Sequence, residues 1–228
     1  MPVDADYRLL TALAEELKLP LLQIARQSEL AAMQNKPAAN IPQTAEMAMK
    51  LIDGYILGLQ TADQMHLELE PVTLSSILYD TAEALKGVAK VQGYELRIDV
   101  SRKFGPVMGD RQALQTAFTI LGYELMTAPA EDTARTITLA THRSRSGVVA
   151  GIFADNPLLS TDAFRRARAL TGSARQALPA ATAANGAGIF IADNLLRVVS
   201  SSFKIARHHK QTGLAATLIP SRQLAFIR

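Results

Sequence analysis

The stretch MGDRQALQTAFTIL, residues 108–121, lies between two strand-like patterns and decides the fold class. We expect a helix that follows Gly109-Asp110 and runs from Arg111 to Met126. Before it, YELRIDV (94–100) alternates apolar and polar residues, which predicts a strand. After it, ARTITLATHR (134–143) and GVVAGIFAD (147–155) are expected to pair as a hairpin. A helix set among strands indicates an α/β domain.

The remainder of the second half continues this mixture of helices and strands. Residues 171–188 are rich in Ala, Gly, Thr and Pro and are expected to be a mobile loop. The other expected elements are helices at 74–92, 162–170 and 189–199 and strands FKIARHH (203–209) and GLAATLIP (213–220). Residues 162–170 suggest only a short helix. The three longer helices and the strands predict a mixed-sheet α/β sandwich, assigned to residues 69–228.

The N-terminal part, residues 1–68, is predicted to be an antiparallel helical hairpin. A breaker cluster at residues 35–42 separates two helical patterns. A hairpin with an apolar stripe on each helix leaves apolar surface exposed, and a four-helix bundle made by two chains would cover it. We therefore expect a homodimer formed through residues 7–65. The stripes consist of Leu10, Leu13, Leu17, Leu21 and Ile24, and of Ala45, Ala48, Ile52, Tyr55, Leu59 and Ala62.

Composition argues against several classes of function. The 228 residues carry a net charge of +3, without a run of like charges or many aromatics, which argues against nucleic-acid binding. Cysteine is absent, so disulfides and thiolate sites are excluded. The four scattered histidines argue against a histidine-based metal site, and no metal ligand is assigned. No signal peptide or membrane span is recognisable, so a cytoplasmic protein is expected.

Five stretches, in this order, resemble the core of bacterial sensor histidine kinases. They are ELKLPL (16–21), HLELEPVTLSSIL (66–78), MGDRQALQTAFTIL, NGAGIFIADNLLRVV (185–199) and QTGLAATLIP (211–220). The resemblance extends from about residue 7 to residue 220. It implies a dimerisation and histidine-phosphotransfer hairpin, followed by an ATPase domain of the gyrase, Hsp90, histidine kinase and MutL (GHKL) type.

The resemblance places Glu15 at the position of the phospho-accepting histidine. Pro20 then matches the family's helix-bending proline, and Glu16 matches the acid beside the acceptor. Glu15 lies about 200° around the helix from the apolar stripe, so it is expected to face solvent. A carboxylate cannot form the phosphoramidate that an imidazole nitrogen forms. The plainer interpretation, a solvated glutamate on a helix face, stays open.

The family's magnesium-binding asparagines correspond, by the same resemblance, to Thr119 and Tyr123. Neither residue is a good ligand for Mg²⁺, which prefers hard oxygens in octahedral geometry. Glu124 offers a carboxylate one position further, but about 100° around the helix, so it receives little weight. Magnesium binding is therefore doubtful.

The adenine side of the family's site is partly retained. Asp155 matches the aspartate that accepts a hydrogen bond from the adenine amino group, and Asn156 follows it as in many members. The family's next glycines are replaced by Pro157 and Leu159, which restrict the backbone.

On the phosphate side, Gly186 and Gly188 survive before a helix whose N-terminus could receive phosphate. Flexible-loop glycines are an equal alternative. Weak binding of ATP or ADP is the most that this set of residues implies.

Basic residues elsewhere have plainer interpretations. The stretch Arg207 to Lys210 is expected to be a hairpin tip. Four arginines flank the loop at 171–188 and could meet phosphates or form a solvated face: Arg165, Arg166, Arg168 and Arg175.

These residues favour a pseudokinase of two-component signalling that acts by dimerisation and by binding a response regulator or a cognate kinase. One alternative is a divergent active kinase that phosphorylates a partner's histidine in trans. Another is an adaptor of the phosphotransferase or anti-sigma type. A plain α/β domain with only fold-level likeness also stays open.

Overall fold

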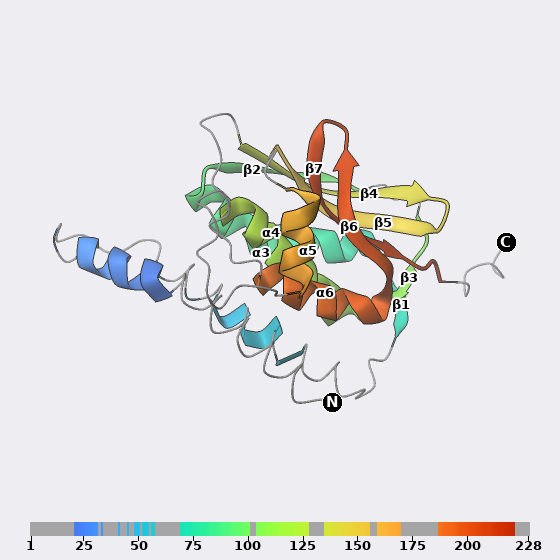
Figure 1. Cartoon of the computed structure of the whole chain (residues 1–228), viewed down its shortest axis with the longest axis horizontal. Coiled ribbons are helices and arrows are strands. Elements are labelled where there is room, and N and C mark those ends of the chain that lie inside the picture. Colours follow the sequence, from blue (N-terminus) through green and yellow to red (C-terminus); the bar gives the residue numbers. More distant parts are fainter. Residues whose placement is uncertain are drawn as a thin grey trace.

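The computed structural model describes residues 21–31, 33, 41, 45, 48–50, 52–54, 56–57, 69–100, 104–127, 135–155, 159–169 and 187–221. Its labelled elements are β1 (Glu70–Val72), α3 (Leu74–Val91), β2 (Tyr94–Asp99), β3 (Val107–Gly109), α4 (Arg111–Thr127), β4 (Arg135–Ser144), β5 (Gly147–Ala154), α5 (Thr161–Ala169), α6 (Ala187–Val199), β6 (Ser200–His208) and β7 (Gln211–Leu218) (Figure 1).

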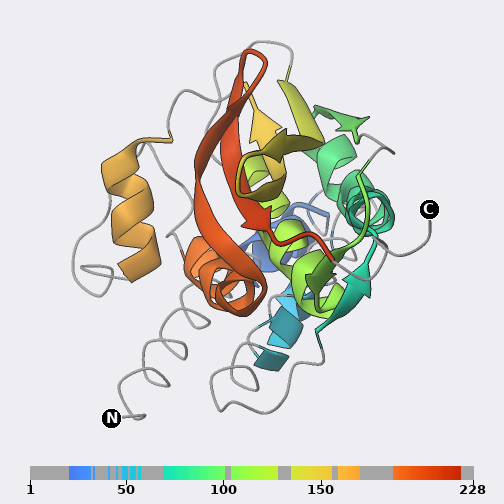
Figure 2. The ribbon, with the colours of Figure 1, turned by 90° about the vertical axis from the view of Figure 1, so that its right-hand side faces the viewer.

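Five strands form one mixed sheet in the order β2-β4-β5-β7-β6. β2 and β4 are parallel, which requires a crossover, and the chain makes it through β3 and α4. The other neighbouring strands are antiparallel. Figures 1 and 2 show α3, α4 and α6 together on one face of this sheet. The opposite face is called the outer face below.

Helix α4 is the centre of the core. Leu114, Phe118 and Leu121 recur at steps of four and three and have no exposed surface. α3 and α6 both pack against α4. The approach of α3 is close at Gly122, where a Cβ would lie 2.3 Å from Cδ1 of Leu85. Full burial of each large apolar side chain is worth about 1.5–3 kcal/mol, so much of the stability of the helical layer comes from α4.

The interior strands β4 and β5 are buried on both faces, with every residue of β5 buried. One face packs on the helices as part of the main core. On the outer face a small second cluster contains Ala140, Val149, Phe153 and Ala215. The side chains in the middle of the sheet are therefore buried from solvent on the outer face as well as on the face that packs on the helices.

The labelled helices and the long strands confirm the sequence predictions to within a few residues. β1 and β3, which pair as a separate two-stranded sheet, were not predicted. The expected mobile loop at 171–188 lies outside the described residues except for its last two positions, which begin α6. None of the helices in the described part of the chain combines the length and apolar character needed to cross a bilayer.

The N-terminal region is described only in part. Residues 21–31 are helical, as the apolar stripe predicts. Residues 48–50, 52–54 and 56–57 are also helical and are called the covering segment here. The remaining positions of the two predicted stripes, apart from Ala45, lie outside the described residues. The hairpin and its four-helix bundle therefore stay predictions.

Truncation of Phe118 should show how far the fold depends on α4. Phe118→Ala removes a fully buried ring, and we expect it to lower the free energy of unfolding by about 3–5 kcal/mol. Gln112→Ala, at an exposed position of the same helix, should change it by less than about 0.5 kcal/mol. Urea unfolding followed by circular dichroism measures both. Similar losses in the two variants would contradict the central place of Phe118.

Candidate functional site

A buried carboxylate joins α4 to the start of α6. Glu124 is only 4% exposed, and its Oε1 accepts a hydrogen bond of 3.0 Å from the backbone N–H of Gly188. A Cβ at position 188 would lie 2.3 Å from the same oxygen. Only glycine therefore allows the backbone to approach the carboxylate this closely.

This contact changes the interpretation of two predicted site residues. By the resemblance, one of the family's magnesium-binding positions corresponds to Tyr123, a poor ligand, and Glu124 received little weight. In the structure Glu124 is the residue of α4 that meets Gly188, whereas Tyr123 is 4% exposed and belongs to the hydrophobic core. Tyr123 and Glu124 are successive residues of α4, so their side chains point about 100° apart around the helix. A carboxylate within the apolar run ILGYELM (120–126) was the available sequence signal for a buried, partnered residue.

The start of α6 is where the sequence predicted phosphate binding. Free N–H groups and the helix dipole make such an end attractive to anions. Here the N–H of Gly188 donates to the chain's own carboxylate. Gly186, the other predicted glycine, lies outside the described residues.

Thr119, the second predicted metal position, is also engaged within its own helix. Its hydroxyl donates a hydrogen bond of 2.8 Å to the carbonyl oxygen of Gln115, and the residue is 4% exposed. This i to i−4 bond is a common way for a threonine to satisfy its hydroxyl inside a helix.

Thr116 and Ile120 precede Glu124 at steps of four on α4, and the N-terminal region packs against both of them. A Cβ on Gly54 would lie 2.8 Å from Cδ1 of Ile120, 3.0 Å from Cγ2 of Thr116 and 3.7 Å from Cγ2 of Ile191. The covering segment thus touches both α4 and α6. Figures 1 and 2 show it, in cyan, beside these two helices.

The same segment buries apolar side chains of its own. Ala48 is 8% exposed, and Leu57 is 9% exposed and belongs to the main hydrophobic core. Ala48 was predicted to lie in the dimer stripe. In the structure it is instead buried within the monomer.

Asp155, the predicted adenine partner, directly follows β5 and is exposed. Nearby, the pKa of Arg97 is raised, first by its hydrogen bond to Glu95 and then by the charge of Glu95, with a smaller contribution from Asp155. Asn156 lies outside the described residues. Leu159 packs against the hydrophobic core, in place of the family's glycine.

A second buried carboxylate fixes α5 on α6. The side chain of Asp193 is 2% exposed and accepts from Arg168 at 2.8 and 2.9 Å and from Arg197 at 3.0 Å. The guanidinium of Arg168 also lies over the rings of Phe164 and Phe203. Arg168 therefore has a structural role, which neither of the sequence interpretations of this arginine group foresaw.

The comparisons with known proteins bear on the fold. No family model matches the sequence, and no curated protein resembles it in sequence. Among solved structures, the histidine kinase AdeS of Acinetobacter baumannii has a TM-score of 0.55 at 11% identity, over 89% of this chain and 97% of that one. The nucleotide-free catalytic domain of the histidine kinase ThkA has a TM-score of 0.54 at 9% identity, over 68% of this chain and 97% of that one.

A third similar structure is full-length ShkA in complex with AMPPNP. Its TM-score is 0.56 at 18% identity, over 94% of this chain but only 46% of that one. The fold is that of histidine kinases. At these identities the likeness extends to the arrangement of elements and no further. The histidine-kinase-like fold expected from the sequence is thus confirmed.

A double-mutant cycle should measure the contact between Glu124 and Gly188. Gly188→Ala alone should cost about 1–3 kcal/mol of unfolding free energy, because its methyl group would overlap the carboxylate. In a Glu124→Ala background the same change should cost much less, with a coupling of about 0.5–3 kcal/mol.

Gly105→Ala is the matched control for this cycle, since nothing lies within 4 Å of its would-be Cβ. It should shift stability by less than about 0.5 kcal/mol. Additive effects of the Glu124 and Gly188 changes in urea unfolding would show that the two residues do not interact in solution.

Proposed function

We propose that this chain is a histidine-kinase-like signalling protein that acts by binding, not by phosphoryl transfer. The observation that carries this proposal is the Glu124 carboxylate on the Gly188 N–H, at the start of α6. The chain presents its own anion where the resemblance expects a nucleotide phosphate.

Electrostatics supports this interpretation of the contact. Two unit negative charges about 4 Å apart repel by about 4 kcal/mol at an effective dielectric of about 20. A phosphate near Gly188 would also have to displace a carboxylate that is buried and already hydrogen-bonded. Nucleotide phosphates therefore fit this helix end poorly.

Magnesium could relieve that repulsion only if the site supplied ligands for it. The Thr119 hydroxyl is bonded to the backbone, and Tyr123 is part of the hydrophobic core. Glu124 is the one hard-oxygen donor of α4 beside Gly188, and its Oε1 already accepts the N–H. The residues present thus do not make a convincing Mg·ATP site.

The covering segment adds a steric argument. Gly54 packs against Thr116 and Ile120, which precede Glu124 on the same face of α4. A ligand lying along this face would have to displace the contacts that Gly54 makes with Thr116 and Ile120. The absence of a phospho-accepting histidine at position 15, where the chain has Glu15 followed by Glu16, fits the same proposal. Both glutamates lie outside the described residues.

Dimerisation is the second part of the proposal. The covering segment buries Ala48 and Gly54 but exposes Met49, Ile52 and Ile56, with exposed fractions of 57%, 37% and 47%. Further apolar side chains exposed in the N-terminal region are Leu21, Leu22, Leu30 and Met33. A second copy would cover this surface, as in the homodimer predicted through residues 7–65. A response regulator or a cognate kinase would bind the dimer.

A divergent active kinase is the second candidate. Asp155 is exposed directly after β5, and ShkA, a protein of similar fold, was solved with AMPPNP. In that case Glu124 would serve as a metal ligand and the covering segment would move away on binding. The two candidates differ in whether Mg·ATP binds.

Calorimetric titration of nucleotide should separate the two candidates. We expect ATP, with or without Mg²⁺, to bind no more tightly than a Kd of about 100 µM, since like charge and the covering segment oppose it. ADP and adenosine should bind about as well as ATP. Micromolar, magnesium-dependent ATP binding that is lost in Glu124→Ala, but kept in a Gln112→Ala control, would establish the active-kinase candidate instead.

The dimer is tested by placing charge on the exposed apolar surface. Ile52→Glu combined with Ile56→Glu should convert dimers to monomers, because two like charges would be buried at each side of the interface. Sedimentation velocity at tens of micromolar protein, about the range in which interfaces of standard size associate, measures the change. Asp53→Asn, an exposed position in the same segment, should leave the dimer intact. A monomeric wild-type chain would contradict this part of the proposal.

A further inference from the structure

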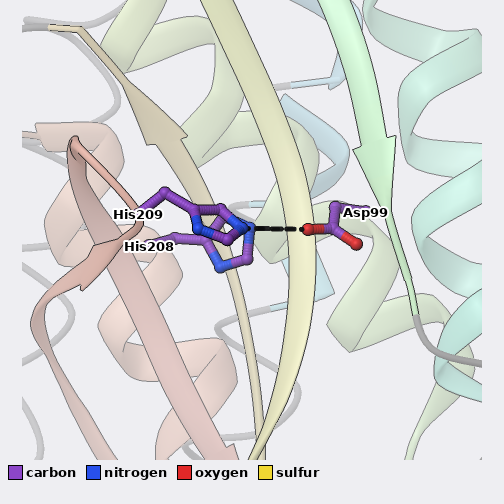
Figure 3. Close-up of side chains that lie close together, drawn as sticks. All are labelled: Asp99, His208 and His209. Atoms are coloured by element: carbon purple, nitrogen blue, oxygen red, sulfur yellow. Dashed lines mark hydrogen bonds and ion pairs between the residues drawn. The ribbon is translucent and has the colours of Figure 1, made fainter.

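A cluster of two histidines and an aspartate lies on the outer face of the sheet. Asp99 ends β2, His208 ends β6, and His209 is the first residue of the turn between β6 and β7. β2 and β6 are the opposite edges of the sheet, so this contact requires the β6–β7 hairpin to bend over the outer face. Figure 3 shows both imidazole rings and the carboxylate converging on one point.

The distances suit a small divalent ion. Oδ2 of Asp99 lies 2.9 Å from Nε2 of His208 and 3.5 Å from Nε2 of His209, and the three ligand atoms all lie within 4.8 Å of one another. Zinc–ligand bonds of about 2.0–2.1 Å in a tetrahedron hold neighbouring ligand atoms about 3.3 Å apart. The distances from Asp99 to His208 and to His209, 2.9 and 3.5 Å, lie on either side of this value. Rotation of the exposed His209 ring can adjust the distance between the two histidine nitrogens.

The conformation of His209 is the second observation. Its φ is +52°, and among the described residues it is the one non-glycine residue with positive φ. Two-residue hairpin turns need positive φ at this first position and therefore favour Gly, Asn or Asp. A histidine here is conformationally unfavourable, yet it directs a nitrogen ligand toward Asp99.

The His208 ring packs against side chains of the two neighbouring strands β4 and β5. It is 11% exposed, lies 5.2 Å from the ring of Phe153 on β5, and stacks on His142 of β4 at 6.3 Å. A ring fixed by packing provides a pre-oriented ligand, which lowers the cost of ordering the site.

We propose that Asp99, His208 and His209 bind a divalent transition-metal ion of the zinc class. Two imidazole nitrogens, one carboxylate oxygen and a water match the ligand set of an open zinc site. The ion would tie β2 to the β6–β7 hairpin across the outer face. The sequence argued against a histidine site because its histidines are scattered, but folding brings two of them to Asp99, which is 109 residues away from His208.

Zinc titration of tag-free, chelator-treated full-length protein tests this site. Zn²⁺ should bind one ion per chain with a Kd of about 10 µM or tighter. At about 100 times the Kd it should raise the melting temperature by about 5 °C. Co²⁺ at the same site should give visible absorption bands that report its coordination.

Two substitutions isolate the ligands without endangering the fold. His209→Gly suits the positive φ, so the metal-free variant should melt within about 2 °C of the wild type. Asp99→Asn is nearly isosteric and 58% exposed. Loss of a residue that only hydrogen-bonds to a metal ligand typically weakens metal binding by roughly 10- to 100-fold. Each of these variants loses a ligand itself, so it should weaken zinc binding by more than that and should abolish the zinc-induced rise in melting temperature.

Glu95→Gln removes an exposed carboxylate from the same face of β2, four residues from Asp99, without removing a proposed ligand, and should change the zinc affinity by less than about threefold. The proposal fails if the wild type binds no Zn²⁺ at about 100 µM, which would leave only a hydrogen bond between Asp99 and His208. It also fails if both ligand variants keep the wild-type affinity.

Discussion

One buried hydrogen bond, from the Gly188 N–H to Glu124, ties the start of α6 to the apolar layer built around α4. A carboxylate can be tolerated inside an apolar layer only when its desolvation is offset by such partners. The bond fixes the start of α6 against the end of α4, and α6 in turn carries Asp193, which holds α5 through Arg168. Two buried carboxylates, Glu124 on α4 and Asp193 on α6, thus help to hold the last two helices, α6 and α5, in place.

The same bond links stability to the proposed function. In a nucleotide-binding protein the first N–H groups of a helix are typically left for the ligand's phosphates. Here one is used to hold the fold together, and the neighbouring face of α4 is packed against Gly54. On the proposal made above, a single set of contacts stabilises the monomer and occupies the helix end at which the resemblance places a nucleotide phosphate.

The sequence predicted the elements well where they are long and periodic. α3, α4, α6 and the strands β4, β5 and β7 each repeat their pattern over several turns or alternations. β1 and β3 contain three residues each, too few for a period to be recognised. The site was harder to predict. Tyr123, which the resemblance matched through an unlike residue, lies in the hydrophobic core, and its neighbour Glu124 makes the buried contact with Gly188, which the sequence did not predict. The meeting of Asp99 with His208 depends on how the hairpin bends over the sheet, which no local pattern encodes.

The chemistry of β2 has a consequence for solubility. Among the described residues it is an edge strand, which pairs with β4 on one side and presents a row of backbone groups able to accept another strand on the other. Its outer-face positions are Glu95, Arg97 and Asp99, all exposed and all charged. A neighbouring molecule that added a strand here would have to bring its own side chains against these charges and strip them of water. The edge is thereby protected from the strand-to-strand association that leads to aggregation.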